Sequence, residues 1–248
     1  FLSVEVAVTV TTSVLKVQDG KTGHLLPSIS SSTGLTIIFA GLIGGILWNL
    51  LTWLFGIPSS SSHALFGGLI GAGLAALGTA GVNWGGVISK VLVPAVASPV
   101  IAGIVAMTGT WLVLRISRSI ERSFADRGFR WGQIGGASLL SLSHGTNDAQ
   151  KTMGVITLAL IGAGLWTDTH SIPWEVKIVC ALAIALGTFI GGWRIIRTMG
   201  KGLVEISPAQ GVAADCSSAA VILASSQMGF ALSTTHVATG SILGSGVG

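Results

Sequence analysis

Long apolar segments separated by short polar ones make up most of this chain. Four of them, residues 34–57, 63–80, 92–114 and 178–193, contain no Asp, Glu, Lys or Arg. A helix needs about 20 residues to cross the hydrocarbon core of a bilayer. The pattern therefore predicts an all-α polytopic membrane protein, and we interpret residues 1–15 as the end of a further spanning helix.

The composition supports this prediction. The 248 residues are 50% hydrophobic and only 9% charged, whereas a soluble globular domain has roughly 25% charged residues. Glycine contributes 36 residues, as expected where helices pack closely in lipid. The net charge of +4 comes from a few basic loops, so it bears on membrane topology and gives no reason to expect a nucleic-acid partner.

Charged residues cluster in a few places between the apolar segments. Five arginines fall within residues 115–130, and Arg194, Arg197 and Lys201 form a second basic cluster, whereas residues 167–175 contain no Lys or Arg. Basic loops of membrane proteins face the cytoplasm. We therefore expect a multi-pass protein of the cell membrane (plasma or inner membrane), with both basic clusters inside.

Two apolar regions are each interrupted by a short polar tip. Residues 58–63 read Pro-Ser-Ser-Ser-Ser-His, and residues 232–236 read Leu-Ser-Thr-Thr-His. An offset of 173 residues aligns six identical residues around the tips and keeps the hydroxyl groups at two more positions, which indicates an internal repeat. The identical pairs are Gly56 and Gly229, Ser60 and Ser233, His63 and His236, Gly67 and Gly240, Gly71 and Gly244, and Gly73 and Gly246.

The loop charges give the two copies opposite orientations. If residues 115–130 form a cytoplasmic loop, the first hairpin enters the membrane from outside and the second from inside. Such an inverted-topology repeat is typical of secondary transporters. We predict two re-entrant helical hairpins, 34–80 and 207–248, whose polar tips meet near the bilayer midplane. The first repeat then covers residues 1–114 and the second covers residues 131–248.

The tips have the chemistry of an anion site. The first N–H groups of a helix are unpaired and carry the positive end of the helix dipole, so together with hydroxyls they bind an oxyanion. The alternative is structural, because a serine before a helix also acts as an N-cap, with the neighbouring serines bonded to helix carbonyls. Recurrence of the tip on the opposite face favours the binding interpretation.

Asn147 and Asp148 form a second polar group inside an apolar region. A carboxylate within a span costs about 2.5–3.5 kcal/mol on insertion scales, so it is a candidate for function. We expect Ser143 to Asp148 to break the helix 131–166, and Asp148 to hold a cation or a proton next to the anion. Two structural alternatives are a cap at the break and a simple ion pair with Lys151.

Three motifs of the chain resemble those of the inorganic phosphate transporter (PiT) family. They are Pro-Ser-Ser-Ser-Ser-His-Ala-Leu-Phe-Gly-Gly-Leu-Ile-Gly-Ala from residue 58, Ser-His-Gly-Thr-Asn-Asp-Ala-Gln-Lys-Thr-Met-Gly from residue 143, and Leu-Ser-Thr-Thr-His from residue 232. The resemblance covers essentially the whole chain. It implies a symporter of inorganic phosphate, driven by H⁺ or Na⁺, and no enzyme; in bacterial members phosphate is also expected to travel as a neutral complex with a divalent metal.

The resemblance also assigns residues. No resident cofactor or structural metal is expected, and the partners are inorganic phosphate and the lipid bilayer, with a homodimer left open. The residues expected to bind phosphate are Ser60, Ser61, Ser62, Ser233, Thr234, Thr235 and Asn147. Asp148 and Asn147 are expected to bind the coupling ion, and the surrounding candidates are His63, His236, His144, Gln150 and Lys151.

One departure from the family pattern is evident. The family carries a first Asn-Asp motif in the opening helix of the first repeat, and the offset of 173 puts it about 26 residues before Phe1. We therefore expect residues 1–248 alone not to transport. Two alternatives remain open: a carrier of sulfate or another oxyanion on the same scaffold, and an intramembrane hydrolase that uses a serine or an aspartate.

Overall fold

The structure is a computed structural model of the chain. It describes residues 6, 14–16, 29–118, 122–168, 171–201 and 203–248. The interpretation of residues 1–15 as a spanning helix lies almost entirely outside these described residues.

The described residues are almost all helical, which confirms the all-α prediction, and their β-structure is limited to an isolated bridge between Leu15 and Val82. Short turns of 3-10 and π-helix, Gly78–Gly81 and Ile88–Leu92, flank a four-residue helix, α4. The helices are α2 (Ser31–Leu54), α3 (Ser61–Leu77), α4 (Trp84–Val87), α5 (Val93–Ser117), α6 (Arg122–Gly162), α7 (Trp174–Gly191), α8 (Trp193–Lys201), α9 (Pro208–Gln227) and α10 (Thr234–Val247).

Local sequence explains where the hairpin arms begin. Ser30 caps α2, because its hydroxyl accepts a hydrogen bond from the Thr33 amide. Ser207 and Gln210 form a reciprocal capping box at the start of α9, a motif that satisfies two unpaired N–H groups at once. The arms of both predicted hairpins are thus helices, within a few residues of the expected bounds.

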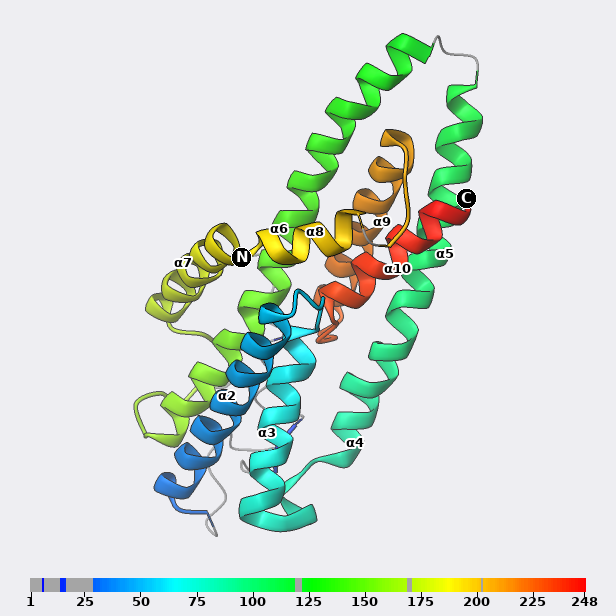
Figure 1. The fold of residues 1–248 in the computed structure, drawn as a ribbon. Helices are drawn as coiled ribbons and strands as arrows, with labels where there is room; N and C mark the ends of the chain where they lie inside the picture. Colours follow the sequence, from blue (N-terminus) through cyan, green and yellow to red (C-terminus); the bar gives the residue numbers. More distant parts are fainter. Residues whose placement is uncertain (1–5, 7–13, 17–28, 119–121, 169–170, 202) are drawn as a thin grey trace.

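The two hairpins meet in the middle of the molecule. α2 packs on α3 as one helical hairpin, and α9 and α10 form another that packs between α5 and α6. In Figure 1 the turns of both hairpins point toward the centre, where α3 and α10 begin close to one another. α8 lies across the turn of the first hairpin, because Thr198 donates to the Gly56 carbonyl and Arg194 donates to the Leu54 carbonyl.

Glycines allow the closest helix contacts, and the two repeats use them differently. In the second repeat, a Cβ at Gly240 or Gly244 would overlap the backbone of Pro99 or Gly103, so α10 and α5 touch backbone to backbone. Their repeat partners, Gly67 and Gly71, have no neighbouring atom within 4 Å of such a Cβ. The first repeat instead brings α3 onto α2 through Gly68, which approaches the Gly41 carbonyl.

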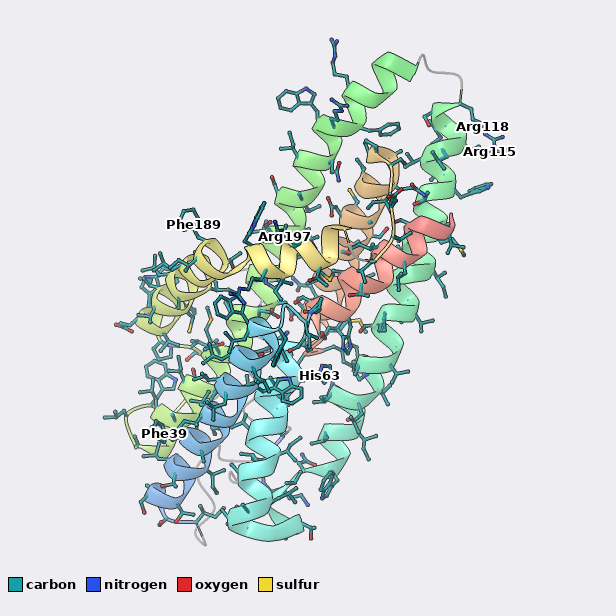
Figure 2. All side chains as sticks on the ribbon, in the orientation of Figure 1. Phe39, His63, Arg115, Arg118, Phe189 and Arg197 are labelled. Carbon is teal, nitrogen blue, oxygen red and sulfur yellow. The ribbon has the colours of Figure 1, made fainter. Side chains whose placement is uncertain are left out.

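The outer surface of the helices is apolar. Phe39 on α2 is 65% exposed and Phe189 on α7 is 89% exposed, and Figure 2 places Arg115 and Arg118 at one end of α5. Four helical segments among the described residues are long and apolar enough to cross a membrane. They are Ser31–Leu54, Ser61–Gly81, Trp84–Ser117 and Trp174–Gly191. An apolar exterior of this extent is the surface of a helical bundle in lipid.

Two sequence predictions about the middle of the chain are wrong. α6 continues without interruption from Arg122 to Gly162, so Ser143 to Asp148 do not break the helix expected over 131–166. Residues 115–130 do not form a long loop, because α5 reaches Ser117 and α6 begins at Arg122. Packing of α6 against α9 and α7 outweighs the weak helix propensity of glycine and asparagine, which costs about 1 kcal/mol or less per residue.

The glycine contacts yield a paired prediction. Gly244→Ala should lower the apparent melting temperature of the detergent-purified protein, because overpacking costs about 1–3 kcal/mol and here the overlapping atom is backbone. Gly71→Ala, at the repeat-equivalent position, is the matched control and should be neutral or slightly stabilising. Equal effects of the two substitutions in thermal unfolding would contradict this asymmetry.

Candidate functional site

The first tip is built around the N-cap of α3. Gly56 has a φ of +67°, a conformation that favours glycine, and it turns the chain out of α2. Ser60 then caps α3, because its hydroxyl accepts a hydrogen bond from the His63 amide at 3.2 Å. The same hydroxyl lies 2.7 Å from the His63 ring nitrogen Nδ1. The capping alternative is therefore realised at Ser60.

The second tip repeats this local geometry. Gly229 has a φ of +69°, and Ser233 caps α10 by accepting from the His236 amide at 3.2 Å. The backbone angles of the two caps agree within a degree, φ −82° and ψ 108° at Ser60 against φ −82° and ψ 109° at Ser233. The sequence repeat around the tips is thus a repeat of local backbone geometry.

The two tips touch each other directly. Thr235 donates from its hydroxyl to the Ser59 carbonyl at 3.3 Å, and the Ser62 hydroxyl lies 3.4 Å from the Leu232 carbonyl. The side chains of Ser62 and Thr234 are buried, whereas Ser61 is exposed. The structure therefore brings most of the predicted hydroxyls to one contact between the tips.

Lys151 joins both tips to α6. Its Nζ donates to the Asp148 carboxylate oxygen Oδ1 at 2.6 Å, to the Ser62 hydroxyl at 2.6 Å and to the Leu232 carbonyl at 2.5 Å. The other carboxylate oxygen of Asp148 accepts from Thr234 at 3.1 Å. Ion pairing of Asp148 with Lys151, one of the two structural alternatives, is thus present, and it forms part of the contact between the tips.

The other α6 candidates surround this contact unevenly. His144, whose side chain is 41% exposed, has its Nδ1 3.5 Å from the Asp148 oxygen Oδ2. Asn147 is fully buried and donates to Ser226 on α9 at 2.7 Å, while its carbonyl oxygen Oδ1 has no hydrogen-bond partner among the described residues. Gln150 points toward the N-terminal segment, where its side-chain oxygen accepts from the Val6 amide. Gln150 therefore does not face the tips.

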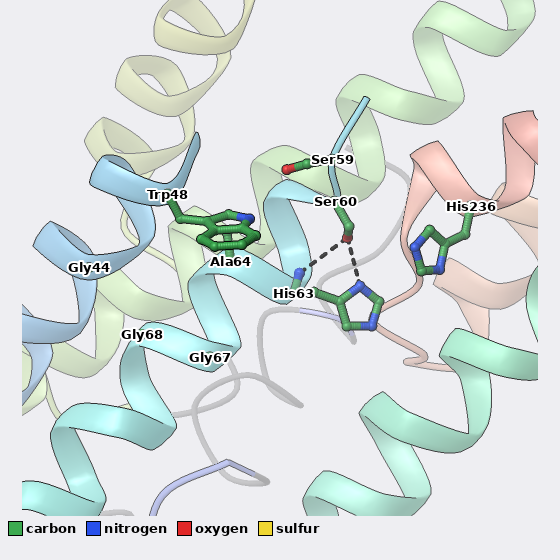
Figure 3. A pocket seen from close by; sticks show the side chains of 9 residues that line it. All are labelled: Gly44, Trp48, Ser59, Ser60, His63, Ala64, Gly67, Gly68 and His236. Carbon is green, nitrogen blue, oxygen red and sulfur yellow. Dashed lines mark hydrogen bonds between the residues drawn. The ribbon is translucent and has the colours of Figure 1, made fainter. Parts of the chain in front are cut away.

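His63 and His236 stack on each other at the edge of the tip contact. Their ring centroids are 5.0 Å apart with an angle of 24° between the planes. Figure 3 shows both rings beside a cavity of about 660 Å³ that Ser59, Ser60 and Trp48 also line. The two repeat-equivalent histidines thus come together, which makes this cavity part of the site.

Five of the seven predicted phosphate ligands line three different cavities, and Ser233 and Asn147 line none of these three. Ser60 faces the cavity beside the stacked histidines. Ser61 and Ser62 line a second cavity of about 240 Å³ together with Asp148 and Lys151. Thr234 and Thr235 line a third cavity, also of about 240 Å³, with His144.

Sequence reasoning missed three participants. Ser59 accepts a hydrogen bond at its backbone carbonyl, and its hydroxyl accepts from Thr52 at 3.2 Å. Leu232 contributes only its carbonyl, and Ser226 fixes the Asn147 amide. A run of serines could have indicated Ser59, whereas a backbone carbonyl leaves no side-chain signal. Among the described residues, no group of three His, Cys, Asp or Glu side chains is arranged to hold a metal ion.

Comparison with known proteins identifies the family. The model of the phosphate transporter family matches residues 1–248. The chain belongs to this family. Proteins of the phosphate transporter family carry solutes and are not enzymes, so the hydrolase alternative is set aside. Together with the four candidate spans, membership makes the chain part of a membrane protein.

Individual relatives agree with this assignment. The chain is 64% identical over 216 residues to a probable low-affinity inorganic phosphate transporter of Mycobacterium tuberculosis, covering 86% of the chain and 52% of the relative. It is 44% identical over 225 residues to a protein of the same description from Bacillus subtilis, covering 91% of the chain and 67% of the relative. The chain thus spans about half the length of the mycobacterial relative.

One solved structure shares the fold of this chain. It is named "The sodium-dependent phosphate transporter" and matches with a TM-score of 0.81 over 97% of this chain and 74% of that structure. The sequence identity is 22%, so the likeness establishes the arrangement of helices only.

The serine caps can be tested directly. Ser60→Ala should lower the free energy of unfolding by about 1 kcal/mol, because it removes the acceptor for the His63 amide at the start of α3. Ser61→Ala is the matched control, since Ser61 is exposed and lies one residue further along the same tip. Denaturant unfolding of both variants in detergent micelles measures the difference, and equal stabilities would contradict the cap.

Proposed function

We propose that the full-length protein carries inorganic phosphate across the cell membrane together with a coupling ion. Membership in the phosphate transporter family and the descriptions of the mycobacterial and Bacillus relatives support phosphate as the substrate. The name of the solved structure supports a coupling ion, because that protein is called sodium-dependent.

The observation that carries this proposal is the convergence of positive charge and hydroxyls between the tips. α3 and α10 both begin there, each behind a serine cap, so the positive ends of two helix dipoles face one region. The ammonium of Lys151 lies at the same place. An oxyanion placed between the tips would replace the bonds that Ser62 and Leu232 now make to Lys151 and to each other.

Loading then requires the tips to part, because they touch in the structure. We infer that phosphate takes the hydroxyls of Ser60, Ser61 and Ser62 on one side and those of Ser233, Thr234 and Thr235 on the other. Asn147 has a buried carbonyl oxygen without a partner among the described residues, and it lies one residue from Asp148. Asp148 is the acid whose charge links phosphate movement to a cation.

The proposed transport route uses the two hairpins as an inverted repeat. Hairpins that enter from opposite faces would expose the same site alternately to each side of the membrane. The matching geometry of the Ser60 and Ser233 caps supports a shared origin of the two hairpins. Their opposite orientation in the bilayer rests on the arginines of residues 115–130 and the charge distribution of the other loops.

Uptake assays test the substrate and the coupling together. The full-length protein in liposomes should accumulate labelled phosphate under an ion gradient, and sodium and proton gradients are imposed separately to identify the coupling ion. Helix N-termini and hydroxyls accept any tetrahedral oxyanion, so unlabelled sulfate is included as a competitor. Competition by sulfate equal to that by phosphate would replace the proposed substrate, and uptake that ignores both gradients would remove the coupling.

Asp148→Asn should reduce gradient-driven phosphate uptake at least about tenfold, because it removes a buried charge that is paired in the fold. Glu175→Gln in the first turn of α7 is the control, since it removes an exposed carboxylate far from the tips along the chain. Membrane insertion of each variant is measured alongside the uptake rate. Gradient-driven uptake by the inserted Asp148→Asn variant at the unchanged rate would contradict the coupling role.

A further inference from the structure

Lys151 has an unusual set of partners for a buried lysine. Its side chain is 3% exposed, and its three nearest partners are a carboxylate oxygen of Asp148, the hydroxyl of Ser62 and the carbonyl of Leu232, all within 2.6 Å. An ammonium group has three N–H donors, so these oxygens use all of them. Each donor of the ammonium therefore has an oxygen acceptor in the fold.

The three oxygens come from separate parts of the fold. Ser62 is in the first turn of α3, Leu232 precedes α10, and Asp148 is on α6. A carboxylate, a hydroxyl and the carbonyl of a non-helical residue form the kind of oxygen set that hard metal cations take in proteins. Discontinuous hairpins of secondary transporters offer such carbonyls to their coupling ions. The oxygen set is thus a cation site, and a side chain of the protein fills it.

We propose that Lys151 is a tethered cation that occupies the coupling-ion position at Asp148, so that sodium does not bind there and phosphate uptake does not require sodium. This inference rests on the proposed transport function and specifies its ion dependence. A sodium ion would have to displace the ammonium from three short bonds, and both carry the same charge, so the two exclude each other. The likeness to a sodium-dependent transporter at 22% identity concerns the fold and leaves the ion dependence to residues such as this one.

The alternative is that Lys151 is only a strut between the tips. The two roles differ in what happens when the side chain is shortened. If Lys151 only bridges the two tips, shortening its side chain leaves a weaker contact between them, and uptake by the variant responds equally to every salt. A tethered cation leaves an oxygen set around Asp148 with one negative charge, which a free sodium ion can fill.

The decisive experiment compares three variants of the full-length protein in liposomes. Wild type should take up phosphate at the same rate, within about twofold, when sodium is replaced by choline at a constant proton gradient. Phosphate uptake by Lys151→Ala in choline should fall at least about tenfold, because the largely buried Asp148 loses its lysine partner. Uptake by this variant should recover with a saturable dependence on sodium. Lys151→Met, which fills the space without a charge or an oxygen, should not respond to sodium. Lys177→Ala, at a partly exposed lysine of α7 that lies over the Trp174 ring, should behave as wild type.

A binding readout separates this inference from transport itself. The melting temperature of purified Lys151→Ala should rise with sodium chloride relative to choline chloride at equal ionic strength, and that of wild type should not. Lys151→Asn serves in the same measurement if the alanine variant does not fold. Sodium-dependent uptake or sodium-specific stabilisation of wild type, or indifference of both the alanine and asparagine variants to sodium, would overturn the tethered cation. Absence of phosphate uptake by wild type under every gradient would overturn the proposed function, while the melting measurement still tests the cation site.

Discussion

A buried lysine ammonium joins the two hairpin tips to α6 at the centre of this structure. A buried charge is tolerated only when it is paired and hydrogen-bonded. Lys151 is bonded to Ser62 on α3, to Asp148 on α6 and to the carbonyl of Leu232, which precedes α10. Removing any one of these three acceptors would leave one N–H of the buried ammonium without a partner. Among the described residues, Lys151 is therefore the one group that bonds to both hairpin tips and to an acid of α6 at the same time.

The helical hairpins follow from the sequence, because apolar arms of about 20 residues with a polar tip have few other solutions in lipid. The serine caps were predictable as well, since Ser60 and Ser233 precede their helices at the same place in the repeat. The continuity of α6 through Gly145 and Asn147 was not predictable from the sequence. Local propensity differs by less than about 1 kcal/mol between helix and break at such residues, and the contact of α6 with α9 decides the outcome.

The sequence indicated which polar residues lie at the centre of the structure, but it did not indicate which residues they contact. Sequence spacing brought Lys151 within reach of Asp148, because residues three apart share a helix face. Nothing in the sequence showed that the same ammonium would reach Ser62 and the carbonyl of Leu232, since those contacts join segments 81 and 89 residues away. The stacking of His63 on His236 has the same origin, because it depends on how two hairpins meet and not on either alone.

The glycine contacts connect the two hairpin tips to different parts of the fold. α10 lies against α5 with no side chains between Gly240 and Pro99 or between Gly244 and Gly103, so neither helix can slide without the other. Among the described residues, the corresponding backbone contact of the first hairpin is between its own two arms, through Gly68 and Gly41. A displacement of Thr234 at the start of α10 would therefore also move α5, a helix of 25 residues. The far end of α5 carries Arg115 and is followed by the short connection to α6. Backbone contact thus links the second tip to the end of α5 that carries Arg115, whereas hydrogen bonds from Arg194 and Thr198 link the turn of the first hairpin to α8.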